Sequence, residues 1–461
     1  MAPKFGTSGL RGLVVDLTDD LCRRYTRAFL SSVAPTEVLF IGRDLRPSSE
    51  RIAAAVASAA GAGCRVVDCG ALPTPALALA AMAAGAPSIM VTGSHIPADR
   101  NGLKFYSATG EITKAEENAI TARADAESGA GGVANITHAT DAASAFATRY
   151  LRHFQSGSLT GLRIGVWQHS SVARDLLVEV AAGLGAAVVP LGRSDAFIPV
   201  DTEAVDPDTR ARLREWTRLH ELDAVISADG DGDRPLVTDA SGEVVAGDIL
   251  GTLTAMAVGA DTVVTPVSSN SLIERTGAFA LVRRTRIGSP FVIAGMEEVA
   301  GSGCRPVGFE ANGGFLLGFD LVQDGKGLTR LATRDSFLPI FAPLVLAQAQ
   351  HQSLGALVAT LPPRRTAADR LENVATDRSQ ALVRSLAEDP GARADFFAGF
   401  GAQTSLDLTD GLRVTFADGR IVHLRPSGNA PELRCYAEAE SAAEAEKTLR
   451  FALQRTATRL T

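Results

Sequence analysis

The hexapeptide DGDGDR sets three carboxylates, Asp229, Asp231 and Asp233, at alternate positions and follows them directly with Arg234. Carboxylates this close repel one another unless a cation neutralises them, and hard oxygen ligands suit Mg²⁺ or Ca²⁺. A calcium-binding EF-hand loop needs glycine at its sixth position and glutamate at its twelfth. Counted from Asp229, those positions hold Arg234 and Ala240, so the EF-hand fails. The pattern favours a divalent-cation site with positions open for a phosphate oxygen over a solvated acidic turn.

Ser94 is a second candidate, in the stretch VTGSHIPADRNGLK, with His95 beside it and Lys104 ten residues on. The nucleophile elbow of a serine hydrolase needs glycine two positions before and two after the serine. Threonine and isoleucine stand there, which disfavours a hydrolase. A serine that carries phosphate needs a flexible turn, cations and a metal, which Arg11, Lys104 and the aspartate loop could supply. His95 need not face Ser94, since a lone histidine in a turn is more often structural.

Two further loops carry polar side chains suited to a sugar phosphate. RPSGNAPELR combines guanidinium, hydroxyl and amide donors with a glycine-containing turn, which suits a phosphate. GFEANGGF offers a carboxylate and an amide that suit sugar hydroxyls. Each signal is weak or moderate alone, because such turns are common on protein surfaces. The candidate residues are Arg425, Ser427, Gly428, Asn429 and Arg434 in the first loop, and Glu310 and Asn312 in the second.

The chain has 461 residues, 46% of them hydrophobic, and a formal net charge of −7. This length favours several domains, and the mild acidity argues against general nucleic-acid binding or attachment to a membrane surface. The sequence starts without an apolar signal-peptide core, and prolines interrupt its most apolar stretch. Five cysteines without paired spacing are typical of reduced thiols. We expect a cytoplasmic protein without nucleic-acid or membrane partners, and its oligomeric state stays open.

Three stretches share one plan, in which short apolar runs alternate with helical patterns. They begin at VLFIGRDLRPSS, LRIGVWQHSS and TVVTPVSSNS, and they end in SIMVTGSH, LDAVISADGDGDR and CRPVGFEANGG. This alternation predicts α/β units around buried, mostly parallel strands, with ligand loops where strands end. The tail differs, because strands joined by an Asp418–Gly419 hairpin turn precede a charged helical pattern.

The predicted fold is α/β: three similar α/β domains with mixed, mostly parallel sheets, plus a smaller C-terminal α+β domain. Each domain would contribute one of the loops described above. A segment with paired prolines near Pro362 would lead into the last domain. The predicted boundaries are 1–150 for the serine loop, 151–250 for the aspartate loop, 251–362 for the sugar loop and 363–461 for the phosphate loop.

Together and in this order, the loops resemble those of the α-D-phosphohexomutase superfamily over essentially the whole chain. TGSHIPADRNGLK resembles its phosphoserine loop, DGDGDR its magnesium loop, GFEANGG its sugar-binding loop and RPSGNAPELR its phosphate-binding loop. FGTSGLRG, with Arg11, is similar to the N-terminal signature, and GRDLRPSS resembles the segment after the first strand. RTRIGSP resembles the third-domain loop, which adds Gly288 and Ser289 to the substrate-binding candidates.

The resemblance implies an enzyme that moves phosphate reversibly between the 1- and 6-positions of a hexose phosphate. Ser94 would rest as phosphoserine, donate its phosphate to give a hexose 1,6-bisphosphate, and take back the other phosphate. One phosphoserine oxygen and the three aspartates would hold Mg²⁺. Lys104 and Arg11 would neutralise the moving phosphoryl group, and Arg234 would orient the serine loop.

Two loops depart from the superfamily pattern. The sugar loop commonly reads Glu-x-Ser-Gly, often followed by histidine, whereas Asn312 and Gly314 stand at the serine and histidine places here. We therefore look to Lys104 or His95, rather than a histidine of that loop, for the general base. The phosphate loop commonly has Thr-Glu-Pro where this chain has Asn-Ala-Pro from Asn429, so it lacks the acidic residue.

The sugar is the least determined part of the prediction. EANGG and FIPVDTEAVD look most like superfamily members that act on mannose phosphate, so we expect conversion of mannose 6-phosphate to mannose 1-phosphate. Mutases for glucose or glucosamine phosphates are the alternatives, because the epimers mannose and glucose differ by one hydroxyl. A non-catalytic sugar-phosphate-binding protein is an alternative of another class, against which the intact Ser94, Lys104 and aspartates argue.

Overall fold

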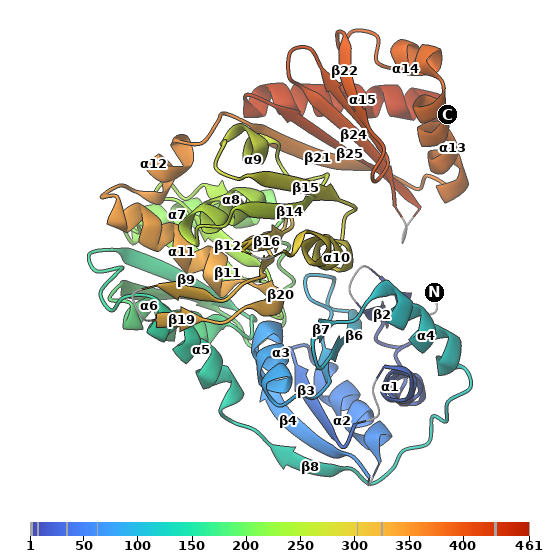
Figure 1. Cartoon of the computed structure of the whole chain (residues 1–461), viewed down its shortest axis with the longest axis vertical. Coiled ribbons are helices and arrows are strands. Elements are labelled where there is room, and N and C mark those ends of the chain that lie inside the picture. Colours follow the sequence, from blue (N-terminus) through green and yellow to red (C-terminus); the bar gives the residue numbers. More distant parts are fainter. Residues whose placement is uncertain are drawn as a thin grey trace. The chain divides into compact units, whose positions relative to one another are not determined.

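The computed structural model describes residues 3–6, 9–33, 36–61, 63–301, 303–323, 326–427 and 431–460. The chain divides into two compact units. Unit 1 comprises Met1–Ala260 and Gly288–Val358, and unit 2 comprises Asp261–Ile287 and Ala359–Thr461. Figure 1 labels the elements of both. Among the described residues, no helix combines the length and the apolar character that crossing a membrane requires.

The first sheet of unit 1 is mixed. Its order is β1-β2-β6-β5-β3-β4-β8, and β7 pairs with β6. β3 is parallel to β4 and β5, and β4 is parallel to β8, whereas β5, β6, β2 and β1 run antiparallel to one another in turn. The strands are β1 (Lys4–Phe5), β2 (Leu10–Leu13), β3 (Val38–Arg43), β4 (Arg65–Ala71), β5 (Ser88–Val91), β6 (Arg100–Ser107), β7 (Gly110–Glu111) and β8 (Asn135–His138).

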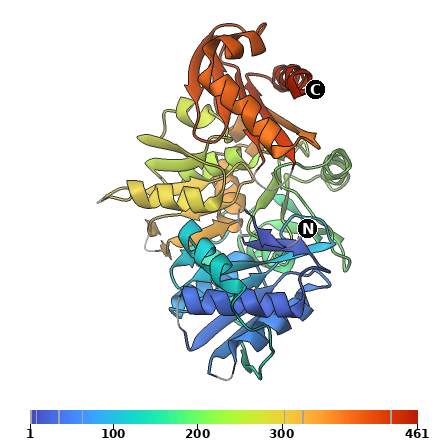
Figure 2. The same ribbon diagram turned by 90° about the vertical axis from the view of Figure 1, so that its right-hand side faces the viewer.

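Helices cover both faces of this sheet (Figure 1). α1, α2 and α4 share one core with the strands, and Figure 2 shows α1 and α4 side by side. α3 lies against β3 and β5 and also packs on α5. Local sequence fixes the helix starts: Thr18 caps α1, and Thr113 with Glu116 forms a capping box at α4. The helices are α1 (Asp19–Ser32), α2 (Ser49–Ala60), α3 (Thr74–Ala83), α4 (Lys114–Ala124) and α5 (Ala142–His153).

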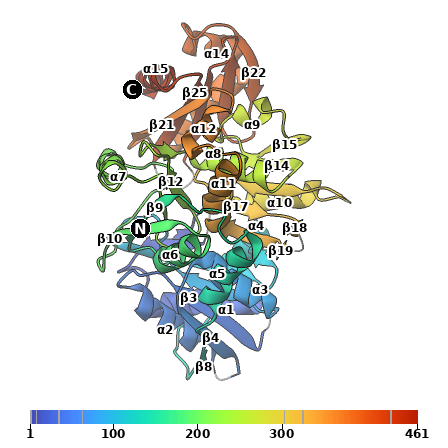
Figure 3. The same ribbon diagram turned by 90° about the vertical axis from the view of Figure 1, so that its left-hand side faces the viewer.

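The second sheet has the order β10-β9-β11-β12-β13. β9 is parallel to β10 and β11, while β12 and β13 return antiparallel. α6 packs on this sheet beside α5 (Figure 3). The elements are β9 (Arg163–His169), α6 (Arg174–Gly183), β10 (Ala187–Arg193), α7 (Pro207–Leu219), β11 (Ala224–Ala228), β12 (Pro235–Thr238), β13 (Val244–Val245) and α8 (Gly247–Ala257).

The remainder of unit 1 contains three antiparallel strands, β16, β17 and β20, with a separate ribbon of β18 and β19. α10 packs on β16, and α11 packs on α8. The elements are α10 (Ser289–Val299), β16 (Pro306–Phe309), β17 (Phe315–Leu317), β18 (Leu321–Gln323), β19 (Lys326–Leu328), β20 (Leu331–Asp335), α11 (Phe337–Ala349) and α12 (Leu354–Ala359).

Unit 2 contains the parallel pair β14–β15 and an antiparallel sheet of order β21-β25-β24-β23-β22. α13 and α15 pack on that sheet over a core of its apolar side chains. The predicted Asp418–Gly419 hairpin turn joins β23 to β24, with Gly419 at φ 82°. The elements are β14 (Thr262–Pro266), α9 (Leu272–Arg275), β15 (Leu281–Thr285), β21 (Arg365–Glu372), α13 (Thr376–Glu388), α14 (Pro390–Phe396), β22 (Gln403–Asp407), β23 (Leu412–Phe416), β24 (Ile421–Pro426), β25 (Glu432–Ala439) and α15 (Ala442–Leu460).

The predicted α/β fold with mixed sheets and an α+β end is confirmed. The division into four segments stays a prediction. Two of its boundaries, at residues 150 and 250, fall inside α5 and α8.

Candidate active site

Three candidate loops of unit 1 are turns of antiparallel hairpins. The serine loop joins β5 to β6, the aspartate loop joins β11 to β12, and the sugar loop joins β16 to β17. The first strand of each hairpin, β5, β11 or β16, is buried along its whole length, so the polar turn begins where the apolar strand ends. The returning strand also contributes side chains: Lys104 lies on β6, opposite Met90 of β5.

Ser94 is fully buried and adopts a left-handed backbone conformation, with φ 53°. Such a conformation is uncommon for a residue with a side chain and is often found at functional sites. The Ser94 hydroxyl donates to Asp229 Oδ2 at 2.6 Å, and its backbone N–H donates to Thr92 Oγ1 at 2.7 Å. The serine therefore directly contacts the aspartate loop.

Arg46, which follows β3, holds the serine loop in place. Its Nη1 donates to the carbonyls of Pro97 and Arg100, and its Nη2 donates to those of Ser94 and Ile96. The guanidinium also pairs with Asp44 at 3.2 Å and lies over the Phe197 ring. A Cβ on Gly93 would come within 2.6 Å of Arg46 Cζ, which explains the glycine before the serine. Sequence reasoning noted the surrounding motif GRDLRPSS but gave Arg46 no role.

The three aspartates of DGDGDR are fully buried and form a cluster that could hold a metal. One carboxylate oxygen from each lies within 4.8 Å of the others. Lys104 Nζ donates at 2.6 Å to Oδ2 of both Asp231 and Asp233. The opposite oxygens, Asp231 Oδ1 and Asp233 Oδ1, are buried and have no hydrogen-bond partner within the described ranges. Buried carboxylate oxygens left this way are suited to binding a cation.

The aspartates differ in their acidity because they face different neighbours. Burial, together with the charges of Asp231 and Asp233, raises the pKa of Asp229 well above its usual range. Burial also acts to raise the pKa of Asp231, but the Lys104 ammonium and the hydrogen bonds from Lys104 and Thr74 outweigh it and lower that pKa. The cations near the cluster, Lys104, Arg234 and Arg334, therefore act unequally on the three carboxylates.

Arg234 fixes His95 next to the serine. Arg234 Nη1 donates to His95 Nδ1 at 2.7 Å, so this ring nitrogen must accept. Burial and the Arg234 and Arg11 guanidiniums lower the pKa of His95 far below its ordinary value. Ser94 Oγ lies 3.5 Å from the same nitrogen. His95 is therefore neutral with its acceptor already engaged, which does not favour it as the base for Ser94.

Arg11, on β2, is partly buried near these charges. Burial and the Arg234 and Arg334 guanidiniums lower the pKa of Arg11 to about 10. It remains cationic at neutral pH and interacts electrostatically with Asp231 and Asp233. Arg11 thus supplies positive charge to the site.

The sugar loop is held by a residue that sequence reasoning missed. Arg334, on β20, is almost completely buried, and its Nη1 donates to Glu310 Oε2 at 3.3 Å. Asn312 is also buried, and its side-chain oxygen accepts from the Gly314 N–H at 3.0 Å. Nothing near Arg334 in the sequence distinguishes it from other arginines, so only the fold identifies it.

Gly288 and Ser289 begin α10. Gly288 has φ 131°, a backbone conformation that favours glycine. The Ser289 hydroxyl is buried and donates to Glu111 Oε2 at 2.6 Å, so it is engaged by the protein. Glu111, on β7, was not singled out in the sequence either.

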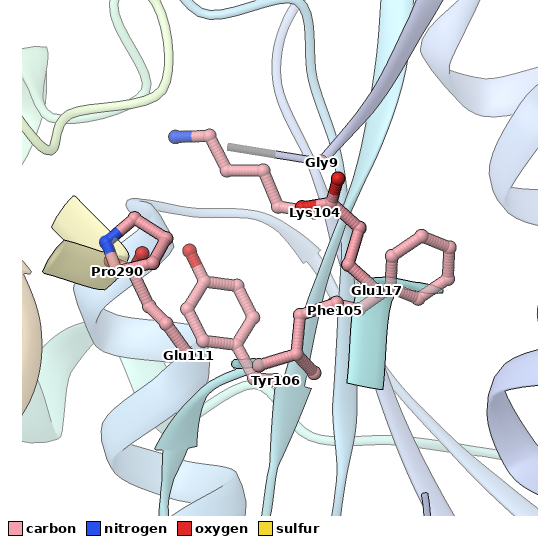
Figure 4. A pocket seen from close by; sticks show the side chains of 8 residues that line it. Gly9, Lys104, Phe105, Tyr106, Glu111, Glu117 and Pro290 are labelled. Atoms are coloured by element: carbon pink, nitrogen blue, oxygen red, sulfur yellow. The ribbon is translucent and has the colours of Figure 1, made fainter. Parts of the chain in front are cut away.

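A cavity of about 20 Å³, room for one water molecule, lies beside the catalytic candidates. Lys104, Tyr106, Glu111 and Pro290 are among its lining residues, and Figure 4 shows the Tyr106 hydroxyl directed between Lys104 and Pro290. Burial and the Glu111 carboxylate raise the pKa of Tyr106 well above its usual range, so the phenol stays protonated. The wall of the cavity thus offers one neutral donor.

In unit 2, Arg425 on β24 and Arg434 on β25 are directly opposite each other in the strand register. Arg425 Nε donates to Asp410 Oδ2 at 2.9 Å, and Arg434 Nε donates to Glu432 Oε1 at 2.9 Å. Ser427 is buried at the end of β24. Like charges opposite each other in a sheet are unfavourable, so this pair suits an anion. The predicted Gly428 and Asn429 lie outside the described residues.

Comparison with known proteins identifies relatives over the whole chain. Models of phosphoglucomutase/phosphomannomutase domains match at residues 2–130 (alpha/beta/alpha domain I), 244–364 (alpha/beta/alpha domain III) and 371–452 (C-terminal domain). A phosphomannomutase of Sinorhizobium fredii is 46% identical, with 97% of this chain and 98% of that protein covered. A phosphomannomutase of Salmonella muenchen is 45% identical, with 96% and 93% covered.

Solved structures share the fold. The crystal structure of a phosphoglucomutase/phosphomannomutase family protein from Burkholderia thailandensis superposes with a TM-score of 0.77 at 22% identity. The match covers 98% of this chain and 96% of that one. At this identity the likeness establishes the fold alone.

Proposed function

The chain belongs to the phosphoglucomutase/phosphomannomutase family, and on that premise we propose that it interconverts mannose 6-phosphate and mannose 1-phosphate. The observation that carries the proposal is the contact between Ser94 Oγ and Asp229 Oδ2, at 2.6 Å, beside Lys104. It joins a phosphate carrier to a carboxylate cluster and a cation in one buried site. The choice of mannose is supported by relatives with this name at 45–46% identity.

In the first half-reaction, phosphate leaves the Ser94 oxygen for the free hydroxyl of the sugar monophosphate. The bond from phosphorus to Ser94 Oγ breaks, a bond to the sugar oxygen forms, and the proton of that sugar hydroxyl ends on Ser94. The products are free Ser94 and a hexose 1,6-bisphosphate. Arg11 and Lys104 supply positive charge to a transfer that depends mainly on positioning and charge stabilisation.

In the second half-reaction the bisphosphate presents its other phosphate, and free Ser94 attacks it. The Ser94 proton must leave as the new bond to phosphorus forms. Asp229 Oδ2 already accepts a hydrogen bond from this hydroxyl at 2.6 Å. Asp229 is therefore the group best arranged to accept this proton. Arg425 and Arg434 bind a phosphate of the sugar in this proposal.

We propose Mg²⁺ as the metal. Asp229, Asp231 and Asp233 would hold it, since three carboxylates with two buried oxygens lacking partners fit a hard divalent cation. When bound, it would add positive charge next to the transferring phosphoryl group. The hexose 1,6-bisphosphate would be the intermediate and also the activator that phosphorylates resting Ser94.

The test is a mutase assay that compares mannose, glucose and glucosamine phosphates side by side. We expect the highest kcat/KM with mannose phosphates and a smaller value with glucose phosphates. Equal or better turnover of glucosamine phosphate would replace the mannose assignment with that alternative. Absence of turnover of all three, with retained binding, would favour a non-catalytic sugar-phosphate-binding protein.

The carrier role of Ser94 has its own readout. Intact mass should show a fraction heavier by about 80 Da, the mass of one phosphoryl group, and peptide mapping should locate it at Ser94. Ser94→Ala should lose the added mass and at least about 1,000-fold in kcat, since the covalent route disappears. Ser107→Ala, on the same β6 hairpin, should keep both. Full turnover by Ser94→Ala would contradict the mechanism.

A further inference from the structure

Arg334 pairs with carboxylates from three separate segments of unit 1. Its Nη2 lies 3.0 Å from Asp233 Oδ2, its Nη1 lies 3.3 Å from Glu310 Oε2, and its Nε lies 3.8 Å from Glu111 Oε1. Its side chain is only 2% exposed. Asp233 belongs to the aspartate loop and Glu310 to the sugar loop, so one guanidinium links two candidate functional loops.

The Arg334 side chain also covers Gly314, the last residue of the sugar loop. A Cβ built on Gly314 would lie 2.8 Å from Arg334 Cδ and 3.1 Å from its Cγ. The Gly314 backbone is not in the left-handed region, so its conformation alone accommodates a side chain. Arg334 therefore makes the two closest contacts with a side chain placed at Gly314, and Asn312 Oδ1 makes a third at 3.2 Å.

We propose that Arg334 is a positioning residue that fixes Glu310 of the sugar loop against Asp233 of the aspartate loop. The proposal rests on the proposed function for the identity of its substrate, a hexose phosphate. Glu310 has one oxygen engaged by Arg334, which orients the carboxylate and leaves Oε1 to accept from sugar hydroxyls. The sugar is thereby held in register with the phosphate-transfer site.

The positions of the two carboxylates suit arginine better than lysine. Nη1 donates to Glu310, while Nη2 lies 3.0 Å from Asp233 Oδ2 as an ion pair without hydrogen-bond geometry, so one extended guanidinium lies next to both. An ammonium is a single point of charge and would pair well with one of them. A buried charge also needs this many opposite charges around it, since unpaired burial is costly.

The end of β20 stays anchored without Arg334. Thr333 Oγ1 donates to Glu111, Asp335 accepts from the Tyr150 hydroxyl and from the first N–H groups of α11, and Ser336 Oγ donates to the Gly232 carbonyl. These bonds hold the strand against the same neighbours through other atoms. Substitution of Arg334 should therefore leave β20 in place, although the buried carboxylates that lose their guanidinium should lower the Tm.

The first experiment tests the space at Gly314 by a thermal double-mutant cycle. Gly314→Ala should lower the Tm of the full chain by about 1.5–4 °C, as overpacking of a core of this size does. The same change in an Arg334→Ala background should lower Tm by clearly less, because Asn312 Oδ1, 3.2 Å from the built Cβ, is then the remaining close atom. Gly327→Ala, whose Cβ would meet nothing within 4 Å, is the matched control and should be additive. Additive losses for Gly314→Ala would overturn the packing part of the proposal.

The second experiment separates positioning from damage to the fold. Arg334→Met should raise KM for mannose 1-phosphate and mannose 6-phosphate about tenfold or more, and Arg334→Lys should give a smaller rise. Partial unfolding would instead reduce kcat through the active fraction and leave KM unchanged. Glu310→Gln should raise KM similarly, and adding Arg334→Met to it should raise KM little further.

An unchanged KM in Arg334→Met, or full additivity with Glu310→Gln, would overturn the positioning role. Absence of mutase activity in the parent protein would contradict the proposed function itself. The thermal cycle would still decide whether Arg334 excludes a side chain at position 314. The two failures are therefore distinguishable.

Discussion

Lys104 occupies one oxygen each of Asp231 and Asp233 and leaves the other oxygens for a divalent cation that the aspartates would hold. Lys104 Nζ binds Oδ2 of Asp231 and of Asp233, whereas Oδ1 of each is buried without a hydrogen-bond partner in the described part of the chain. The ammonium and a metal can therefore share these residues without displacing each other. Arg334 and Arg234 also lie next to Asp233, so the feature that suits a divalent cation is the pair of Oδ1 atoms without hydrogen bonds rather than an excess of negative charge.

Asp231→Asn removes one of these charges and tests the metal site at a single residue. We expect Mg²⁺ affinity to fall at least about tenfold, equivalent to about 1.4 kcal/mol, because the amide offers no charge to the cation. Isothermal titration calorimetry measures this without reference to turnover. Asp208→Asn, an exposed aspartate of α7, is the control and should bind Mg²⁺ like the parent. Equal affinity in Asp231→Asn would exclude the aspartate loop as the metal site.

Single functional residues were predictable from the sequence only where they stand together in a short motif. Ser94 and the aspartates stand in short motifs whose spacing is unusual, and the structure brings them into contact. Arg46 and Arg334 act on loops far from them in the chain, so their neighbours in sequence say nothing about their role. Ser289 was predicted to bind substrate, but its hydroxyl is engaged by Glu111 in this structure, and its role stays a prediction.

At the level of elements, the serine loop depends on the guanidinium of Arg46, a residue outside the β5–β6 hairpin. Arg46 donates to four carbonyls of this loop, and it touches none of the predicted sugar or phosphate ligands except the Ser94 backbone. Arg46→Lys keeps the charge but cannot reach all four carbonyls from one ammonium. We expect kcat to fall about tenfold or more while KM changes less than about twofold, since misplacement of a reacting group costs rate.

Steady-state kinetics with mannose phosphates measures this split. Arg51→Lys, a half-exposed arginine of α2 that pairs with Asp19, is the matched control and should keep the parent kcat. A parent-like kcat in Arg46→Lys would show that the four carbonyl contacts do not position Ser94.

His423, on β24, makes the antiparallel sheet of unit 2 sensitive to acid. It stacks on Tyr436, its Nε2 bonds to the Asp410 carbonyl, and burial lowers its pKa to about 4. An unfolded histidine has a pKa of about 6.5, so the unfolded state takes up the proton first as pH falls. The resulting stability is present above pH 6.5 and is lost on the way to pH 4, by up to about 3 kcal/mol.

We expect His423→Leu to flatten this dependence for peptides of β24 and β25. Hydrogen exchange between pH 7 and pH 4, corrected for intrinsic rates, gives the opening free energy of these strands. The parent should lose stability relative to His423→Leu over this range, and His138→Leu, an exposed histidine of β8, should follow the parent. The same pH slope in parent and His423→Leu would contradict the assignment.

The sequence predicted the alternation of helices and strands, but it did not predict which neighbouring strands pair in parallel and which pair antiparallel. Alternating apolar runs and helical patterns identified α/β units. β3 and β4 are indeed parallel, as are β9 and β11, which are also buried along almost their whole length. The returning strands β6, β12 and β17 are antiparallel, and their pairing depends on contacts across a long turn rather than on local residue preference. Only the short Asp418–Gly419 turn carries its hairpin signal in the sequence itself.

At the level of the whole molecule, the chain passes between its two units more than once. Asp261–Ile287 belongs to unit 2, although residues on both sides of it belong to unit 1. The repeat pattern in the sequence predicts contiguous segments, because it reports local periodicity and not which segments pack together. The family assignment is independent of this division, and it is confirmed by family-model matches at residues 2–130, 244–364 and 371–452.

Each unit carries one predicted anion or cation site, so each should respond to its own ligand. Mg²⁺ without phosphate should slow hydrogen exchange in the segment from β11 to β12 of unit 1. Inorganic phosphate without Mg²⁺ should slow exchange in β24 and β25 of unit 2, where Arg425 and Arg434 lie opposite each other. At a ligand concentration about 100 times Kd, binding stabilises by about 2.7 kcal/mol, which slows exchange about 100-fold where opening disrupts the site.

Two variants make this prediction specific to its residues. Asp231→Asn should lose the Mg²⁺ effect and keep the phosphate effect, because it changes only the aspartate loop. Arg425→Ala should do the reverse, since a charge-assisted hydrogen bond contributes about 1.5–3 kcal/mol and its loss weakens phosphate binding about tenfold or more. Arg425 is also paired with Asp410, so its removal leaves that carboxylate to repel the anion and adds to the loss. If phosphate still slows hydrogen exchange in β24 and β25 of Arg425→Ala, Arg425 does not contribute to phosphate binding there.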